Sequence, residues 1–257
     1  MKTPHILALS MLFTSQISLA ETYLMNGNIY SNKGDFFVEL GALTSSDYYK
    51  EQKDSTSILY NGGYRGDNFN IDLSGLNYRF FMDDTGIFNA NIYAAISGSP
   101  YESSDAKVLA GMSQRRVGAD LGLNGDINFG DGIFSLFFQH DVTGASGGYN
   151  TGLKYAHIFD FGAIDLVPFA GVTYYSDDYV DYYYGVKKSE AKGKRTAYKP
   201  EGEFVYTAGY KLIAELGENL NFNHSAAYVG LGDEMSKSPI MENDYQWLLT
   251  ASISYHF

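Results

Sequence analysis

The sequence predicts an all-β protein, a transmembrane antiparallel up-and-down β-barrel of about 12 strands, with about 10 as the alternative. Three observations predict this fold. Apolar and polar residues alternate along many segments, long and short connections alternate between them, and after the first twenty residues no apolar stretch approaches the roughly 18 residues that a membrane helix needs. Any crossing of a membrane must then be made by strands.

The first residues are predicted to be a secretory signal peptide, residues 1–20. Lys2 precedes an apolar run over 6–13 that is too short to cross a bilayer as a helix. Small residues end at Ala20, which predicts cleavage before Glu21 and a mature barrel domain over 21–257. The chain contains no Cys, which excludes a lipoprotein and disulfides. We therefore expect the mature protein in the outer membrane of a Gram-negative cell.

The last segment shows the alternation best, because successive side chains of a strand point to opposite faces of a sheet. Its odd positions run from Tyr245 to Phe257 and are apolar, whereas its even positions are polar except Leu248. Residues 204–216 repeat the pattern. Further predicted strands are 36–43, 55–64, 68–81, 88–96, 116–127, 133–142, 149–159, 163–175 and 219–230. An even number of strands requires residues 22–31 to form another.

Within residues 68–81 the apolar parity changes near Gly75. A β-bulge at this position would explain the change. The alternative is that one of these stretches is two short strands or a loop. The two interpretations differ by one barrel strand.

The connections provide a second, independent pattern. Counting back from the C-terminus, longer connections alternate with tight turns, as in barrels with short periplasmic turns and longer outer loops. The longer ones are 232–244, 187–201, 143–148 and 99–114, and the tight ones are 217–218, 160–162, 128–132 and 82–85. This alternation requires one tall strand over 163–186. The alternation fails near the N-terminus, because the outer connection 65–67 is short and the periplasmic connection 44–54 is long.

A catalytic or metal site is not predicted. In the predicted strands His140 and Asp141 are neighbours, as are His224 and Ser225, so each pair points to opposite faces and cannot form a dyad. His157 is expected at the membrane interface and His256 on the polar face. The sequence lacks the ordered oxygen ligands of a calcium loop and a phosphate-binding loop before a helix. We expect no enzyme activity and no cofactor.

Two local motifs suggest surface contacts. Arg65-Gly66-Asp67 spells a tripeptide that integrins recognise, although Gly and Asp also suit a tight turn, which is the interpretation we prefer. Six cations gather in one loop of a chain whose net charge is −12, namely Lys187, Lys188, Lys192, Lys194, Arg195 and Lys199. They predict contacts with anions such as lipopolysaccharide phosphates; a merely solvated loop is the alternative. The acidic net charge argues against nucleic acid as a partner.

Two groups of residues resemble a known family, the MltA-interacting protein (MipA) and OmpV family of outer-membrane proteins. The first is 181–186 (DYYYGV) with Glu190 and Tyr198. The second is 232–234 (GDE), 238–240 (SPI) and the last strand. The OmpV branch is most similar, with 27–30 (GNIY) and 139–141 (QHD) also alike. The resemblance implies an outer-membrane barrel and, for the MipA branch, a scaffold joining a lytic transglycosylase to a murein synthase.

Three functions remain open. The first is a scaffold of the murein-synthesising machinery, although most periplasmic turns are short. The second is an adhesin or antigen that meets a host surface through the outer loops. The third is a channel for small solutes, whose lumen would be lined by Arg116, Asp120, Glu203, Lys211 and Glu215. Phe257 resembles the terminal residue recognised by the barrel-assembly machinery, so its deletion should impair insertion into the outer membrane.

Overall fold

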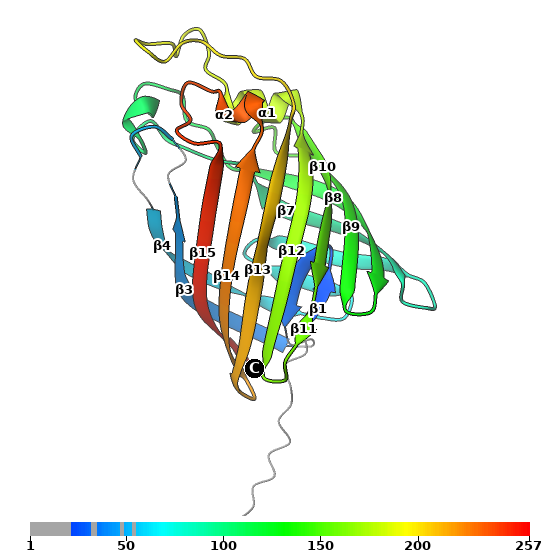
Figure 1. Cartoon of the computed structure of the whole chain (residues 1–257). Coiled ribbons are helices and arrows are strands. Elements are labelled where there is room, and N and C mark those ends of the chain that lie inside the picture. Colours follow the sequence, from blue (N-terminus) through cyan, green and yellow to red (C-terminus); the bar gives the residue numbers. More distant parts are fainter. Residues whose placement is uncertain (1–21, 32–34, 47–48, 53–54) are drawn as a thin grey trace, which may run out of the picture.

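The structure is a computed structural model that describes residues 22–31, 35–46, 49–52 and 55–257. Its dominant feature is one large antiparallel sheet that closes on itself (Figure 1). Neighbouring strands pair in chain order from β3 to β10 and from β12 to β15, and the pairs β3–β15 and β10–β12 close the ring. The short strand β11 also pairs with β12 and continues the line of β10, so twelve strands cross the wall.

The strands of the sheet differ in length, from two residues in β11 to 15 in β13. They are β3 (Asp35–Ser45), β4 (Ser55–Arg65), β5 (Phe69–Asp72), β6 (Gly75–Met82), β7 (Phe88–Ser97), β8 (Gly118–Phe129), β9 (Gly132–Asp141), β10 (Tyr149–His157), β11 (Phe159–Asp160), β12 (Ile164–Tyr175), β13 (Glu203–Gly217), β14 (Leu220–Leu231) and β15 (Tyr245–His256). The predicted up-and-down barrel of twelve strands is confirmed.

The two faces of the wall differ as the alternation predicts. Apolar side chains such as Leu40, Leu123 and Ile253 are exposed on the outside, where a membrane would cover them. Polar side chains such as Asn91 and Asp126 are buried inside. Among the described residues, no helix is long and apolar enough to cross a membrane.

Residues 22–31 do not form a wall strand, so that prediction is wrong. They form a hairpin of β1 (Thr22–Met25) and β2 (Asn28–Ser31) that pairs only with itself and lies inside the barrel. Asn26 and Gly27 occupy its turn with φ values of 55° and 61°, which is the backbone form that an Asn-Gly turn favours. Bonds from Asn26 and Tyr23 to lumen residues attach the hairpin to the wall.

Residues 68–81 form two strands, so the alternative interpretation is confirmed and the bulge near Gly75 is wrong. The parity changes because the chain turns at Leu73 and Ser74, and Asp72 pairs with Gly75 across that turn. A register shift does occur further along β6, between Arg79 and Phe81. The extra strand keeps the total at twelve without the N-terminal hairpin.

Splitting this segment also changes the ends at which the first connections lie. With β5 and β6 as separate strands, residues 49–52 lie at the end of the barrel with the other long connections, and residues 66–68 lie at the tight-turn end with the C-terminus (Figure 1). The assignment of 44–54 to the periplasmic side is therefore wrong. Long and short connections alternate around the ring except between β5 and β6, where the two-residue turn Leu73-Ser74 stands on the side of the long connections.

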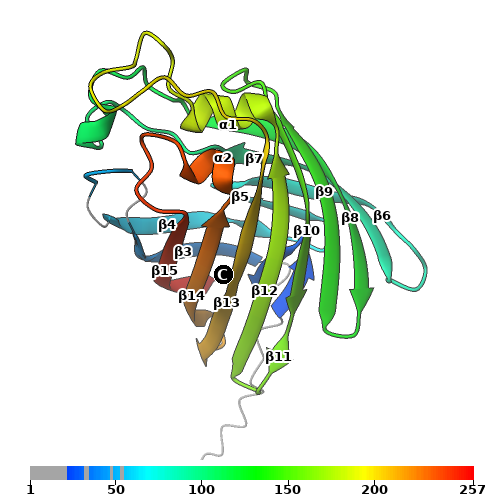
Figure 2. The ribbon, with the colours of Figure 1, turned by 45° about the horizontal axis from the view of Figure 1, so that its top comes forward.

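The predicted tall strand over 163–186 is also wrong. β12 ends at Tyr175, and helix α1 (Asp177–Tyr184) begins directly after Ser176. A second short helix, α2 (Asp233–Ser236), and the 3-10 turn η1 (Lys107–Leu109) also lie in long connections. α1 and α2 contact each other at the end of the barrel where β12 and β14 finish (Figure 2).

Candidate functional site

The long connections fold together into one unit, which we call the outer cap and define as residues 49–52, 98–117, 176–202 and 232–244. Its interior is apolar and buried, with Tyr and Met as the largest members. The buried residues are Tyr49, Tyr101, Ala106, Leu109, Met112, Tyr179, Val180, Tyr183, Tyr184, Val186, Met235, Ile240 and Met241, with Val205 of β13 below them. The cap therefore has a hydrophobic core of its own, separate from the lumen.

An ion pair is buried within the cap. The guanidinium of Arg115 donates to both carboxylate oxygens of Glu190, at 3.1 and 2.9 Å, and the two side chains are only 2% and 4% exposed. Arg115 also donates to the carbonyls of Tyr182 and Ser113. The backbone N–H groups of Ser113 and Lys187 donate to the same carboxylate. This pair joins connections 98–117 and 176–202.

The pKa of Glu190 reflects these contacts. Burial raises the pKa of the carboxyl, but the hydrogen bonds from Arg115 and from two backbone N–H groups together outweigh burial and lower it to about 2. The side chain is thus ionised at neutral pH. Its charge stabilises the cap by holding the buried guanidinium.

The six predicted cations separate into two kinds. Lys187, Lys188, Lys192, Lys194 and Lys199 have exposed side chains. Arg195 is buried and donates to the carbonyls of Glu190, Val108 and Ala110, so its guanidinium holds two connections together. The five lysines remain a predicted anion contact, while the geometry gives Arg195 an internal structural contact.

The family-like residues, which are far apart in the sequence, meet in the cap. Ser238 donates to the carbonyl of Tyr184 at 2.5 Å, and Tyr198 donates to the carbonyl of Glu234 at 3.0 Å. Ile240 is fully buried in the same core. Sequence reasoning identified these residues as markers without a role, and the structure shows that they hold the cap together.

The lumen is the second candidate site, and the β1–β2 hairpin fills part of it. The phenol of Tyr23 donates to Asn70 Oδ1 at 3.1 Å, and the N–H of Asn26 donates to Asp126 Oδ2 at 3.0 Å. The Arg65 guanidinium lies 4.6 Å from the centre of the Tyr30 ring. Lys211 Nζ donates to the carbonyl of Ile29 at 3.5 Å.

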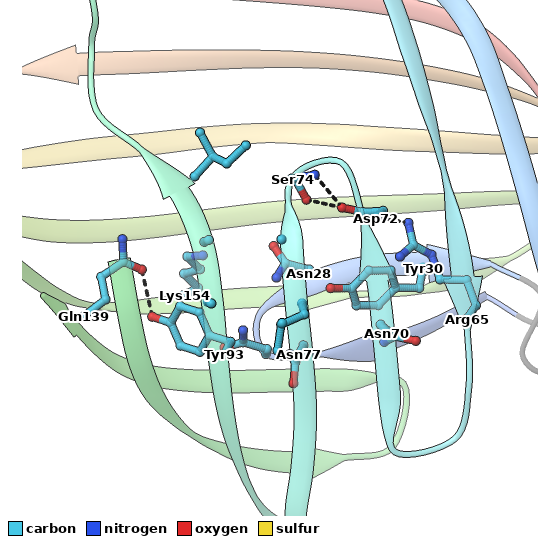
Figure 3. A pocket seen from close by; sticks show the side chains of 16 residues that line it. Asn28, Tyr30, Arg65, Asn70, Asp72, Ser74, Asn77, Tyr93, Gln139 and Lys154 are labelled. Atoms are coloured by element: carbon cyan, nitrogen blue, oxygen red, sulfur yellow. Dashed lines mark hydrogen bonds and ion pairs between the residues drawn. The ribbon is translucent and has the colours of Figure 1, made fainter. Parts of the chain in front are cut away.

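Two cavities lie beside this hairpin. The smaller, about 300 Å³, lies toward β6 and β7; Figure 3 shows Arg65, Asp72 and Ser74 joined by contacts next to Tyr30. The larger, about 500 Å³, lies toward β10, β12 and β13. They share lining residues, namely Asn28, Tyr30, Arg65, Asp72, Ser74 and Lys154. The space around the hairpin is therefore nearly continuous.

Three further sequence expectations can be placed. Arg65 of the Arg-Gly-Asp tripeptide is buried and forms a 2.7 Å ion pair with Asp72 at the tight-turn end, which agrees with the turn interpretation. His140 is exposed while Asp141 is buried, so their side chains do point apart. Within the described ranges, no group of three or more His, Cys, Asp or Glu could hold a metal ion.

The predicted lumen lining is correct only in part. Asp120 is buried in the lumen, where it accepts from Ser97 and Gln139, and Lys211 lines the larger cavity. Arg116 precedes β8 and its side chain is exposed, so its assignment to the lumen is wrong. Glu203 accepts from the N–H of Glu234 and thus belongs to the base of the cap.

The fold and these two sites define a β-barrel of the outer-membrane type, with a folded outer cap and a lumen occupied by its own N-terminal hairpin. Residues 38–257 match the sequence profile of a family described as MltA-interacting protein MipA. The chain belongs to that family. The resemblance inferred from the sequence, including its leaning toward OmpV, is confirmed.

Individual proteins agree with the family assignment. Outer membrane protein OmpV of Vibrio cholerae serotype O1 is 46% identical over 93% of this chain and 93% of its own length. Outer membrane protein Omp26La of Vibrio anguillarum is 45% identical over the same shares. Among solved structures, an outer membrane channel from Pseudomonas putida F1 is similar, with a TM-score of 0.47 and 12% identity, covering 88% of this chain and 96% of that chain. The chain is an outer-membrane protein, while its predicted signal peptide lies outside the described residues.

Proposed function

We propose that this protein is a non-catalytic barrel of the outer membrane that recognises its partners at the cell surface through the outer cap. The observation that carries the proposal is the hydrophobic core of the cap, together with the buried Arg115–Glu190 pair. Loops that are ordered before binding lose less conformational entropy when they bind, so a folded cap is suited to recognition. Open loops around a channel mouth would not need such a core.

The exposed lysines of the cap suggest the chemistry of one partner. Lys187, Lys188, Lys192, Lys194 and Lys199 give connection 176–202 a dense positive charge in a chain with a net charge of −12. Phosphate groups of lipopolysaccharide are the anions nearest to this face of an outer-membrane barrel, and lysine offers them charge-assisted hydrogen bonds. Anionic groups on a host surface would be attracted by the same charges.

A binding experiment tests the proposal. The purified barrel is flowed over immobilised lipopolysaccharide at several salt concentrations, and a variant with all five lysines replaced by Gln is compared with it. Arg195 is kept, because it holds the cap together. We expect weaker binding with a smaller salt dependence for the variant, since surface charge interactions are screened by salt. Equal binding and equal salt dependence would exclude the lysines as the contact.

A scaffold for the murein-synthesising machinery is the second candidate function. It is favoured by the family, which is described by its interaction with MltA. The tight-turn end of the barrel offers little surface to a partner, because its connections are short, such as 130–131 and 218–219. Photo-cross-linking in cells from a residue in each of these turns would test this role. Capture of a lytic transglycosylase or murein synthase supports the scaffold, whereas capture of neither argues against it.

A further inference from the structure

The larger lumen cavity has the size and the lining of a ligand site. Its volume of about 500 Å³ falls within the roughly 300–1,000 Å³ range of small-molecule pockets. Aromatic and aliphatic side chains, including Tyr155, Phe169 and Ala170, form one side of it. The hairpin completes it with Ile29 and Tyr30. The recognition proposed for the outer cap does not depend on this cavity.

The charges around this cavity are unequal. Its lining contains three cations, Arg65, Lys154 and Lys211, and two carboxylates, Glu39 and Asp72. Arg65 is already paired with Asp72 at 2.7 Å. Among the described residues, neither lysine has a carboxylate within ion-pair distance: the Lys154 ammonium lies 4.9 Å from the centre of the Phe137 ring, and Lys211 reaches only a carbonyl, at 3.5 Å. The cavity thus carries a net positive charge in an acidic protein, which favours an anion.

The wall beside the cavity contains a seam. β4 pairs with β3 along its whole length but with β5 only at Tyr64 and Arg65. From Ser55 to Gly63, the part of the chain that the structure describes provides no strand partner on the β5 side. Among the described residues, one hydrogen bond crosses this unpaired stretch, from the N–H of Leu73 to Asn61 Oδ1 at 3.2 Å. Edges of this kind are normally paired or covered.

The seam lies between the cavity and the lipid-facing surface. Asn61, Asp72 and Ser74, which border the seam, also line the larger cavity. On the outside of the same edge, Ile58 and Tyr60 are 73% and 69% exposed. A molecule at this position would meet apolar side chains in the membrane and positive charge in the lumen. The long axis of such a ligand would cross the wall.

We propose that the lumen cavity binds the anionic head group of a single-chain amphiphile, such as a fatty acid, which enters sideways from the outer membrane through the seam between β4 and the β5–β6 hairpin. Lys154 and Lys211 hold the head group, and Ile58 and Tyr60 contact the chain. An amphiphile fits better than a free anion, because the seam is bordered on the outside by the apolar side chains Ile58 and Tyr60 and on the inside by residues that line the charged cavity.

Calorimetric titration with octanoate tests the head-group site. The full mature barrel is placed in phosphatidylcholine nanodiscs, and the heat from empty nanodiscs is subtracted. We expect saturable octanoate binding that weakens by about tenfold or more in the double variant Lys154→Met/Lys211→Met, because two charge-assisted contacts are lost. A matched variant with two exposed cap lysines changed, Lys107→Met/Lys237→Met, should bind as the parent does.

Three other probes check that charge and chain are both recognised. Octanol and octylammonium have the same chain without the negative charge, and acetate has the charge without the chain. Binding of octanol or octylammonium as tightly as octanoate, or of acetate as tightly as octanoate, would overturn the proposal. So would octanoate affinity that is unchanged in the Lys154/Lys211 variant. Heat-modifiable migration of each variant on a gel establishes that the barrel is folded.

A disulfide across the seam tests the route. Because the chain has no cysteine, Asn61→Cys/Leu73→Cys introduces a single possible bridge at the one bond that crosses the seam. Oxidation should close the route and slow octanoate exchange, and reduction should restore it. Unchanged exchange in a sample whose bridge is complete by mass spectrometry would show that ligands do not enter through the seam.

Discussion

The outer cap and the lumen are built on opposite principles. In the cap, apolar side chains form a core and each buried guanidinium donates to several acceptors, as Arg115 and Arg195 do. In the lumen, polar side chains dominate, two cavities remain, and Lys154 and Lys211 have no ion-pair partner among the described residues. Close packing with satisfied polar groups fixes one conformation, whereas a polar space with unpaired charge can accommodate a ligand. This difference supports the two proposals, rigid recognition by the cap and adaptable binding in the lumen.

The largest effect is expected from breaking the buried ion pair of the cap. Glu190→Gln leaves the Arg115 guanidinium buried without its counter-charge, and removing one partner of a buried pair costs about 3–5 kcal/mol. The loss should appear as faster proteolysis within 98–117 and 176–202, while the barrel keeps its heat-modifiable migration.

A second ion pair in the cap provides the control. Lys237 and Asp233 are 2.6 Å apart, but their side chains are 65% and 78% exposed. Because solvent screens such pairs, Lys237→Gln should leave the stability of the cap nearly unchanged. If Glu190→Gln and Lys237→Gln accelerated proteolysis of the cap equally, the buried ion pair would not be what keeps the cap rigid.

Acid should weaken the cap through the same carboxyl. The pKa of Glu190 falls from its ordinary value of 4.5 in the unfolded chain to about 2 in the fold. A lowered folded pKa contributes stability that is complete above about pH 4.5 and is lost as the pH falls toward 2. Pepsin cleavage of the cap should therefore accelerate across this window. The Glu190→Gln variant lacks the titrating group, so a curve identical to that of the parent would rule out this cause.

The sequence predicts the wall far better than the cap or the lumen. Wall strands such as β13 and β15 show period-two alternation, which depends only on neighbours in the chain. The cap depends on contacts between distant residues, such as Arg115 with Glu190, and neither alternation nor spacing records them. The alternation wrongly predicts a barrel strand over residues 22–31, because a short strand shows the same alternation in a barrel wall and in a separate hairpin. The Asn26-Gly27 pair was the signal that could have shown the turn.

A smaller effect is expected where the hairpin meets the lumen wall. Gly27 has a φ of 61°, and a Cβ there would lie 2.8 Å from Lys154 Cδ. Gly27→Ala should therefore loosen the hairpin by about 1–2 kcal/mol, the usual cost of this backbone form for an L-residue. Faster amide exchange at residues 22–31, with unchanged protection of the cap, is the expected result.

Gly86 is the matched control for this change. It also has a positive φ, 71°, but its Cβ would meet nothing within 4 Å. Gly86→Ala thus introduces the backbone strain at the tight-turn end without the contact to Lys154. If both variants accelerated exchange of the hairpin equally, the hairpin would not be held by its fit against the lumen wall.

The smallest effects come from removing one hydroxyl in each region. Tyr198 donates to the carbonyl of Glu234 at 3.0 Å in the cap, and Tyr93 donates to Gln139 Oε1 at 2.8 Å in the lumen. Tyr198→Phe should lower the stability of the cap by about 1 kcal/mol, the usual net value of one hydrogen bond. Proteolysis of the cap measures this loss. Tyr93→Phe should lower the free energy of unfolding of the barrel by less, because Tyr93 and Gln139 line a cavity in which water can replace the lost donor. A larger cost for Tyr93→Phe than for Tyr198→Phe would mean that the lumen is as tightly built as the cap, and the division between rigid recognition and adaptable binding would fail.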